Sequence, residues 1–123
     1  MKLILEQIER MNAGREMDAL IAEDIMGWTR VYGRSGLWNT QSESVRFTND
    51  IPYYSIKIAD AWKIIETMRE AGYHSRVETQ ICPTVIFWKK GLIERGPSPV
   101  TYRATSTPLA ICRAALIAVM EAE

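Results

Sequence analysis

The segment TPLAICRAALIAVMEA, from Thr107 to Ala122, decides the fold class. Thr107 is a favoured helix N-cap, and Pro108 suits the first helical position. Apolar side chains recur along the segment at helical spacing, and Arg113 is the one charged residue between Pro108 and Met120. Because so little of its surface is polar, we expect this helix to be buried on more than one side.

Three stretches before this helix alternate in the manner of β-strands. They are SRVETQI (75–81), TVIFWKKG (84–91) and PVTYRATST (99–107). The middle stretch differs from the other two, because Val85 and Phe87 make one face apolar and Ile86 and Trp88 make the other apolar as well. That pattern predicts a strand with partners on both sides, or one whose second face another helix or subunit covers.

A second helix is predicted over residues 55–71. Ser55 is a favoured N-cap, because its hydroxyl can accept a hydrogen bond from a free first-turn amide, and Gly72 ends the helix. Pro52 keeps Ile51 extended, so the chain enters this cap from outside the helix. The apolar stripe that we expect to face the core consists of Ile58, Trp62, Ile65 and Met68, with Ala61 beside it.

The first helical signal is NAGREMDALIAEDIMG, residues 12–27, with Asn12 as its N-cap and Gly27 at its end. Residues 1–11 form either one or two extra helical turns or a mobile lead-in. The carboxylates of this helix are spaced as on a solvated face. They are Glu16, Asp18, Glu23 and Asp24.

Residues 27–54 break the helical pattern with glycine, Asn, Ser and Thr among several aromatic side chains. We expect an irregular segment, with a short strand at residues 45–47 and room for a small hairpin. A connection of this length is usually functional or disordered, and this one is too aromatic to be a solvated linker.

The predicted order is therefore helix, irregular segment, helix, three antiparallel strands and helix, in one domain over residues 1–123. We assign it to the α+β class, with a small antiparallel sheet of about three to four strands layered with helices. Helix, three strands and helix is also the order of a double-stranded-RNA-binding domain. That kind of domain needs lysines at the start of its last helix, where this chain has only Arg113, so nucleic acid is not the expected partner.

Three blocks of the chain resemble the phage ABA sandwich domain family, whose members are small proteins of bacteriophages and prophages. The blocks are MNAGREMDALIAEDIMGW (11–28), PYYSIKIADAW (52–62) and the segment 107–122. The resemblance implies an α-β-α sandwich of helix, sheet and helix layers, and it implies no particular activity. Ile56 and Lys57 depart from the family pattern, which has Thr and Asp at these positions, so any role of that acid is in doubt here.

Composition and residue inventory argue against several functions. Lys+Arg and Asp+Glu number 15 each, so a net charge of zero gives no general attraction to nucleic acid or acidic membranes. The single histidine, His74, and two distant cysteines, Cys82 and Cys112, make a catalytic triad or a metal site unexpected. We therefore expect no enzyme and no cofactor. Both cysteines are interpreted as buried thiols of a protein in the host cytoplasm.

The opening MKLILEQIER is too short and too charged for a signal peptide or a membrane span. A neutral chain with 47% hydrophobic residues is prone to self-association, so we expect a homo-oligomer.

The aromatic residues of the irregular segment, interleaved with arginines, are the strongest indication of a ligand site. Aromatic rings stack on bases, and arginine forks bind phosphates. The predicted ligand-binding residues are Trp28, Arg34, Trp38, Arg46, Tyr53, Tyr54 and Arg103. The alternative is that these aromatic residues plug the edge of the core or form a subunit contact.

Three functions fit these residues. The first is a non-enzymatic binder of a small nucleotide-type ligand that sequesters a host immune signal and thereby acts against host defence. The second is a protein-interaction module that binds and blocks a host protein. The third is a structural or assembly protein of the phage.

Overall fold

The computed structural model describes residues 5–31, 33, 36–41, 46–79, 82–89 and 100–122. Four α-helices and two three-stranded antiparallel sheets are present in this part of the chain. The α+β class is confirmed. The elements are α1 (Leu5–Arg10), α2 (Arg15–Asp24), β1 (Thr29–Arg30), β2 (Trp38–Asn39), β3 (Phe47–Thr48), α3 (Ile58–Glu70), β4 (Tyr73–Glu78), β5 (Thr84–Lys89), β6 (Val100–Arg103) and α4 (Thr107–Ala122).

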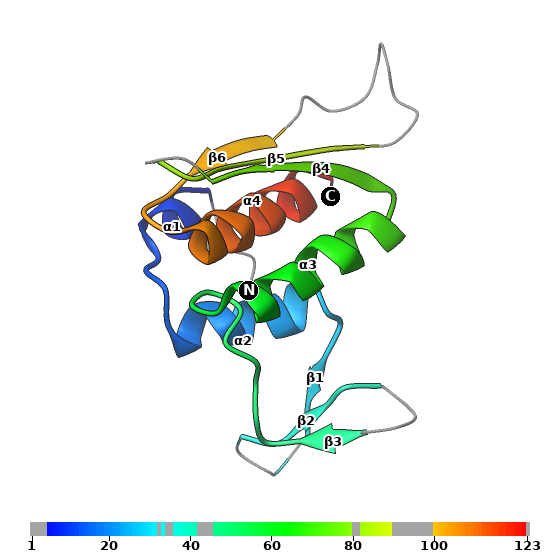
Figure 1. Cartoon of the computed structure of the whole chain (residues 1–123). Coiled ribbons are helices and arrows are strands. Elements are labelled where there is room, and N and C mark those ends of the chain that lie inside the picture. The colour runs from blue at the N-terminus through cyan, green and yellow to red at the C-terminus, as the bar shows by residue number, and fades with distance from the viewer. Residues whose placement is uncertain are drawn as a thin grey trace.

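The larger sheet has the order β4-β5-β6, so β5 has a partner on each side, as its apolar faces predict. Val85 and Phe87 point to the core and are almost fully buried. On the opposite face, the rings of His74 and Trp88 stack with centroids 5.5 Å apart. Figure 1 shows the labelled helices on one side of this sheet, with α1, α3 and α4 next to it and α2 farther away.

Helix α4 begins at Thr107, as predicted, and is surrounded by other elements. It contacts β5, β6, α1, α2 and α3. Every residue from Pro108 to Ala118 is buried except Arg113, whose guanidinium donates two hydrogen bonds to the Met11 carbonyl oxygen at 2.7 and 3.2 Å. Arg113 therefore lies at the edge of the core and fastens the α1–α2 connection to it.

Helix α3 begins at Ile58, three residues later than expected, and its N-cap is Lys57. The prediction of Ser55 as its N-cap was wrong, because the Ser55 hydroxyl bonds to α2 instead. The predicted core stripe was also wrong in part: Ile58 is 50% exposed and Trp62 is 47% exposed. The face that packs into the core is formed by Ala61, Ile64, Ile65 and Met68.

Two expectations for the first part of the chain also change. Helix α2 begins at Arg15 with Gly14 as its N-cap, whereas Asn12 was expected to cap it. Gly27 does follow the helix with a positive φ of 75°, a conformation that suits glycine. The segment 27–54 holds β1, β2 and β3, a small three-stranded sheet rather than a hairpin. Figure 1 shows this small sheet on the side of the helices away from the larger sheet.

Candidate functional site

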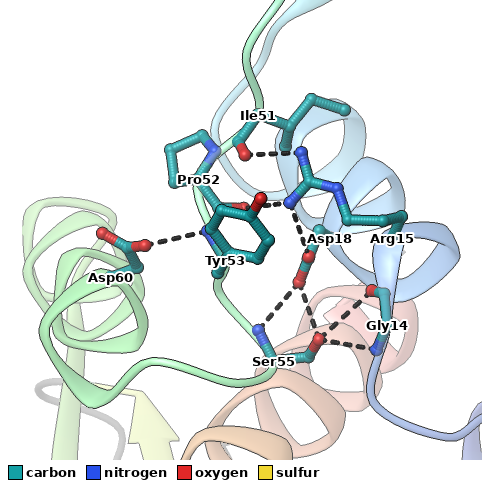
Figure 2. A network of polar contacts seen from close by, with 8 residues as sticks. All are labelled: Gly14, Arg15, Asp18, Ile51, Pro52, Tyr53, Ser55 and Asp60. Atoms are coloured by element: carbon teal, nitrogen blue, oxygen red, sulfur yellow. Dashed lines mark hydrogen bonds and ion pairs between the residues drawn. The ribbon is translucent and has the colours of Figure 1, made fainter.

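The loop from Ile51 to Lys57, which joins β3 to α3, is fastened to α2 by a buried polar network (Figure 2). Asp18 is fully buried, and its Oδ1 accepts hydrogen bonds from the backbone N–H and the hydroxyl of Ser55, at 2.8 and 2.7 Å. The expectation that Asp18 lies on a solvated helix face was therefore wrong. The two charge-assisted hydrogen bonds compensate for its removal from water.

Ser55 also completes the start of α2. The N-cap residue, Gly14, has no side chain, and its backbone N–H donates to the Ser55 Oγ at 2.9 Å. Ser55 lies 41 residues away in sequence, so a distant segment binds one of the amides that a helix start leaves without an internal partner. The position of the loop and the start of α2 therefore depend on each other.

Arg15 extends the network to the surface. Its Nη1 lies 3.0 Å from the Asp18 Oδ2, and its Nη2 donates to the Ile51 carbonyl oxygen at 2.6 Å. Nη1 also lies 3.4 Å from the Pro52 carbonyl oxygen. Because these groups of the same chain occupy both terminal nitrogens, Arg15 holds the loop in place and is poorly suited to bind a phosphate.

Tyr53 lies at the surface of this loop and is 39% exposed. Its backbone N–H donates to the Asp60 Oδ2 at 2.8 Å, which ties it to α3. The Arg15 guanidinium lies 4.3 Å from the ring centroid and the Lys57 ammonium lies 4.8 Å from it. These are cation–π distances, so a ligand base stacking on Tyr53 would compete with cations of the chain itself.

Tyr54, the next residue, belongs to the core and is 2% exposed. Burial raises the pKa of its phenol, and the charges of Asp60, Asp18 and Cys112 add to the increase. Burial also raises the pKa of the Cys112 thiol, with a further contribution from Asp18. Both groups therefore stay protonated at neutral pH, and the Cys112 side chain is a packing group rather than a thiolate nucleophile.

The small sheet places two predicted site residues together. The rings of Trp28 and Trp38 lie 6.5 Å apart, and the Arg30 guanidinium lies 4.5 Å from the Trp38 ring centroid. Trp38 is 2% exposed, and Arg30 is paired with Glu23 at 2.9 Å. This group packs the small sheet against the core, which agrees with the alternative interpretation of these aromatic residues.

Beside it, a pair of exposed side chains lies at the start of β3, with Arg46 just before the strand and Phe47 in it. Phe47 is 53% exposed, and the Arg46 guanidinium lies 6.0 Å from its ring centroid. Arg46 is itself exposed. An aromatic face next to an arginine is the combination that can hold a base and a phosphate.

Those predicted ligand-binding side chains that the structure describes do not lie in one place. Trp38 and Tyr54 are core residues, Trp28 is half-buried against Trp38, and Tyr53 lies on the loop before α3. Arg103 lies in β6 opposite Thr84, and its side chain is outside the described part. Arg34 lies outside the described residues. Arg46 remains as an exposed arginine, with Phe47 beside it.

An exposed apolar surface at the start of α3 was not predicted. We call it the α3 patch: Ile56, in the turn before the helix, and Ile58 and Trp62, within the helix, exposed by 55%, 50% and 47%. Ile58 and Trp62 are one helical turn apart and therefore share a side of the helix. A signal for it exists in the sequence, because Ala61, Ile64, Ile65 and Met68 form a tighter helical stripe than the one that we chose.

The described residues give little support to a metal site, a disulfide bond or a membrane-crossing helix. Among them, no group of three or more His, Cys, Asp or Glu side chains is placed to hold a metal ion. Cys82 and Cys112 are free thiols, and Cys82 is exposed, so the expectation that both are buried was wrong for Cys82. In the same part of the chain, no helix combines the length and the apolar character needed to cross a membrane.

Comparison with known proteins shows which proteins this chain resembles in fold and in sequence. A phage protein from Bacillus cereus has a similar solved structure, with a TM-score of 0.62 and 24% sequence identity, over 87% of this chain and 94% of that chain. This likeness supports the fold alone. No curated protein matches the chain. The sequence model of the phage ABA sandwich domain matches residues 19–116. The chain therefore belongs to the phage ABA sandwich domain family.

Proposed function

We propose that this phage protein is a non-enzymatic binding protein of the host cytoplasm that contacts and blocks a host protein through the α3 patch. The observation that carries the proposal is the exposure, about half each, of Ile58 and Trp62, one turn apart in α3, and of Ile56, two residues before Ile58. Isolated surface hydrophobic residues are common, but apolar side chains gathered at one place mark interaction sites. Trp is also the residue type most enriched among side chains that dominate binding energy.

The patch residues have burial energy left to contribute to a contact. Fully burying an apolar side chain of this size is worth about 1.5–3 kcal/mol, so each patch residue has about half of that still to gain. The rim of the patch is polar, with Lys57, Lys63 and Glu66 exposed. An apolar centre with a polar rim is the usual anatomy of a protein–protein interface.

Loss of the patch should abolish capture of the partner. We expect Trp62→Ala and Ile58→Ala to weaken binding of the host protein at least 10-fold, while thermal unfolding changes little because both side chains are exposed. Phe47→Ala is the matched control, since it removes an equally exposed aromatic ring from β3. The measurement is quantitative affinity capture from host lysate, followed by titration of the purified partner. Equal binding by all variants would contradict the proposal.

A second candidate, binding of a small nucleotide-type ligand such as a cyclic dinucleotide or an ADP-ribose derivative, is favoured by the exposed Arg46–Phe47 pair. In this role the protein would sequester a host immune signal. Calorimetry against a panel of these nucleotides is the test. Arg46→Ala and Phe47→Ala should each weaken binding about 5-fold or more, because stacking and a phosphate contact are each worth at least ~1 kcal/mol. Arg69→Ala, at another exposed arginine, is the control. Absence of binding at high micromolar ligand would remove this candidate.

A further inference from the structure

We infer that two copies of the chain pair through their β4 strands, so that two larger sheets become one continuous antiparallel sheet. Strand β4 lies at the edge of the order β4-β5-β6. It runs from Tyr73 to Glu78 and pairs with β5 without interruption over its whole length. Within the described residues, β5 is its one strand partner. The proposed contact is separate from the α3 patch and does not rest on the proposed function.

The edge of β4 lacks most devices that protect strands from pairing. Monomeric proteins shorten an edge strand, bend it with a bulge, or place proline in it. Strand β4 contains no proline, and its register with β5 has no bulge. Its remaining protection is charge, since His74, Arg76 and Glu78 alternate with the core-facing residues. Whether these side chains prevent or favour pairing with a second copy depends on which charges come to lie opposite each other.

The charges select one register. Arg76 and Glu78 are two residues apart on the same face, and their side chains form an ion pair at 3.1 Å. If two β4 strands run antiparallel with Val77 opposite Val77 of the second copy, Arg76 comes to lie opposite Glu78 of that copy, twice over. A register centred on Arg76 would instead oppose like charges. Cross-strand pairs of opposite charge stabilise a sheet, and like pairs destabilise it.

The ion pair that this register breaks contributes little stability. The Arg76 and Glu78 side chains are 67% and 32% exposed, and an exposed ion pair contributes little stability on its own. The same register places Ser75 opposite Thr79 of the second copy, and Val77, which is half-buried, against its counterpart. The pairing therefore joins residue types that suit a sheet on both of its faces.

The occupant is a second copy because the pattern is self-complementary. A twofold axis through the Val77 pair places each Arg76 opposite Glu78 of the other copy. An unrelated strand would have no reason to carry this matching pattern of charges. The chain has a net charge of zero, so long-range repulsion does not oppose association. Pairing consumes the β4 edge of both copies, so this contact produces a closed dimer rather than a chain of subunits.

Exchanging the charges of Arg76 and Glu78 tests the proposed register of the two β4 strands. We expect the parent protein to dimerise in sedimentation and light-scattering measurements over a concentration series. Arg76→Glu and Glu78→Arg should each weaken dimerisation at least 10-fold, and the double exchange R76E/E78R should restore it. Arg69→Glu, at an exposed arginine of α3, is the control and should leave the dimer unchanged. Circular dichroism of each variant checks that it is folded.

Crosslinking supplies an independent readout. In a Cys82→Ser background, Val77→Cys should form a disulfide-linked dimer under mild oxidation, whereas Thr29→Cys on the small sheet should not. A strict monomer up to millimolar concentration would overturn the inference. So would a dimer that tolerates the single charge changes, a double exchange that restores nothing, or a dimer that Trp62→Ala dissociates. The last result would assign the α3 patch to self-association and would count against the proposed function as well, whereas the other three outcomes leave the proposed function untouched.

Discussion

Replacing Asp18 with leucine should lower the free energy of unfolding by about 3 kcal/mol, although leucine has a similar size. The reason is that the buried backbone N–H of Ser55 loses its acceptor, and the Ser55 hydroxyl keeps only the longer contact to the Gly14 carbonyl oxygen, at 3.2 Å. A buried donor without a partner costs about 1–3 kcal/mol. Arg15 also loses the ion pair that orders it over the loop. Urea unfolding followed by circular dichroism measures the change.

Glu16→Gln is the matched control for this substitution, because Glu16 is an exposed carboxylate in the same helical turn. It should change the unfolding free energy by less than about 0.5 kcal/mol. Ser55→Ala should also destabilise the protein, and the double variant should be less destabilised than the sum of the single changes, because the two side chains share one network. A urea midpoint that is unchanged by Asp18→Leu would show that the network contributes no net stability.

Phe87→Ala should have the largest effect of any single truncation that we propose, about 3–5 kcal/mol. Phe87 is 1% exposed, and its ring meets that of Tyr73 edge to face, at 6.4 Å and 82°. Truncation removes this contact and leaves a cavity between the larger sheet and α4. The measurement is again the free energy of unfolding in urea.

Phe47→Ala is the control with the same chemical change at a surface position. Phe47 is 53% exposed, so its truncation should cost less than about 0.5 kcal/mol. If the two variants were equally stable, the packing of β5 against α4 would not be the main source of stability. If Phe47→Ala alone destabilised the protein, its ring would be buried in a contact that the isolated chain does not show.

The larger sheet and α4 were predictable because their sequences agree with their environments. Alternation in residues 84–89 and continuous apolar character in residues 108–118 both reflect burial by neighbours. Thr107 and Pro108 mark the start of α4 by local chemistry alone, and the helix begins there. In these segments, local propensity and tertiary packing favour the same structure.

The polar network was not predictable, because its partners are far apart in sequence. Asp18 and Ser55 are separated by 37 residues, and each has an ordinary local interpretation, as a solvated acid and as a helix N-cap. The same limit applies to Trp38 and Tyr54, whose aromatic rings fit a ligand site or a core equally well. The α3 patch was missed because Ile58 and Trp62 lie beside the core face, where helical spacing alone does not distinguish buried residues from exposed ones.

The central place of α4 has a consequence for how the protein is made. The helix that every other helix contacts comes from residues 107–122, so ribosomes translate more than a hundred residues before the middle of the molecule exists. Until then, the nascent sheet and the earlier helices expose the apolar faces that α4 will cover, and such surfaces invite chaperones or aggregation. Productive folding therefore waits until this segment has been made and can pack against the sheet and the earlier helices.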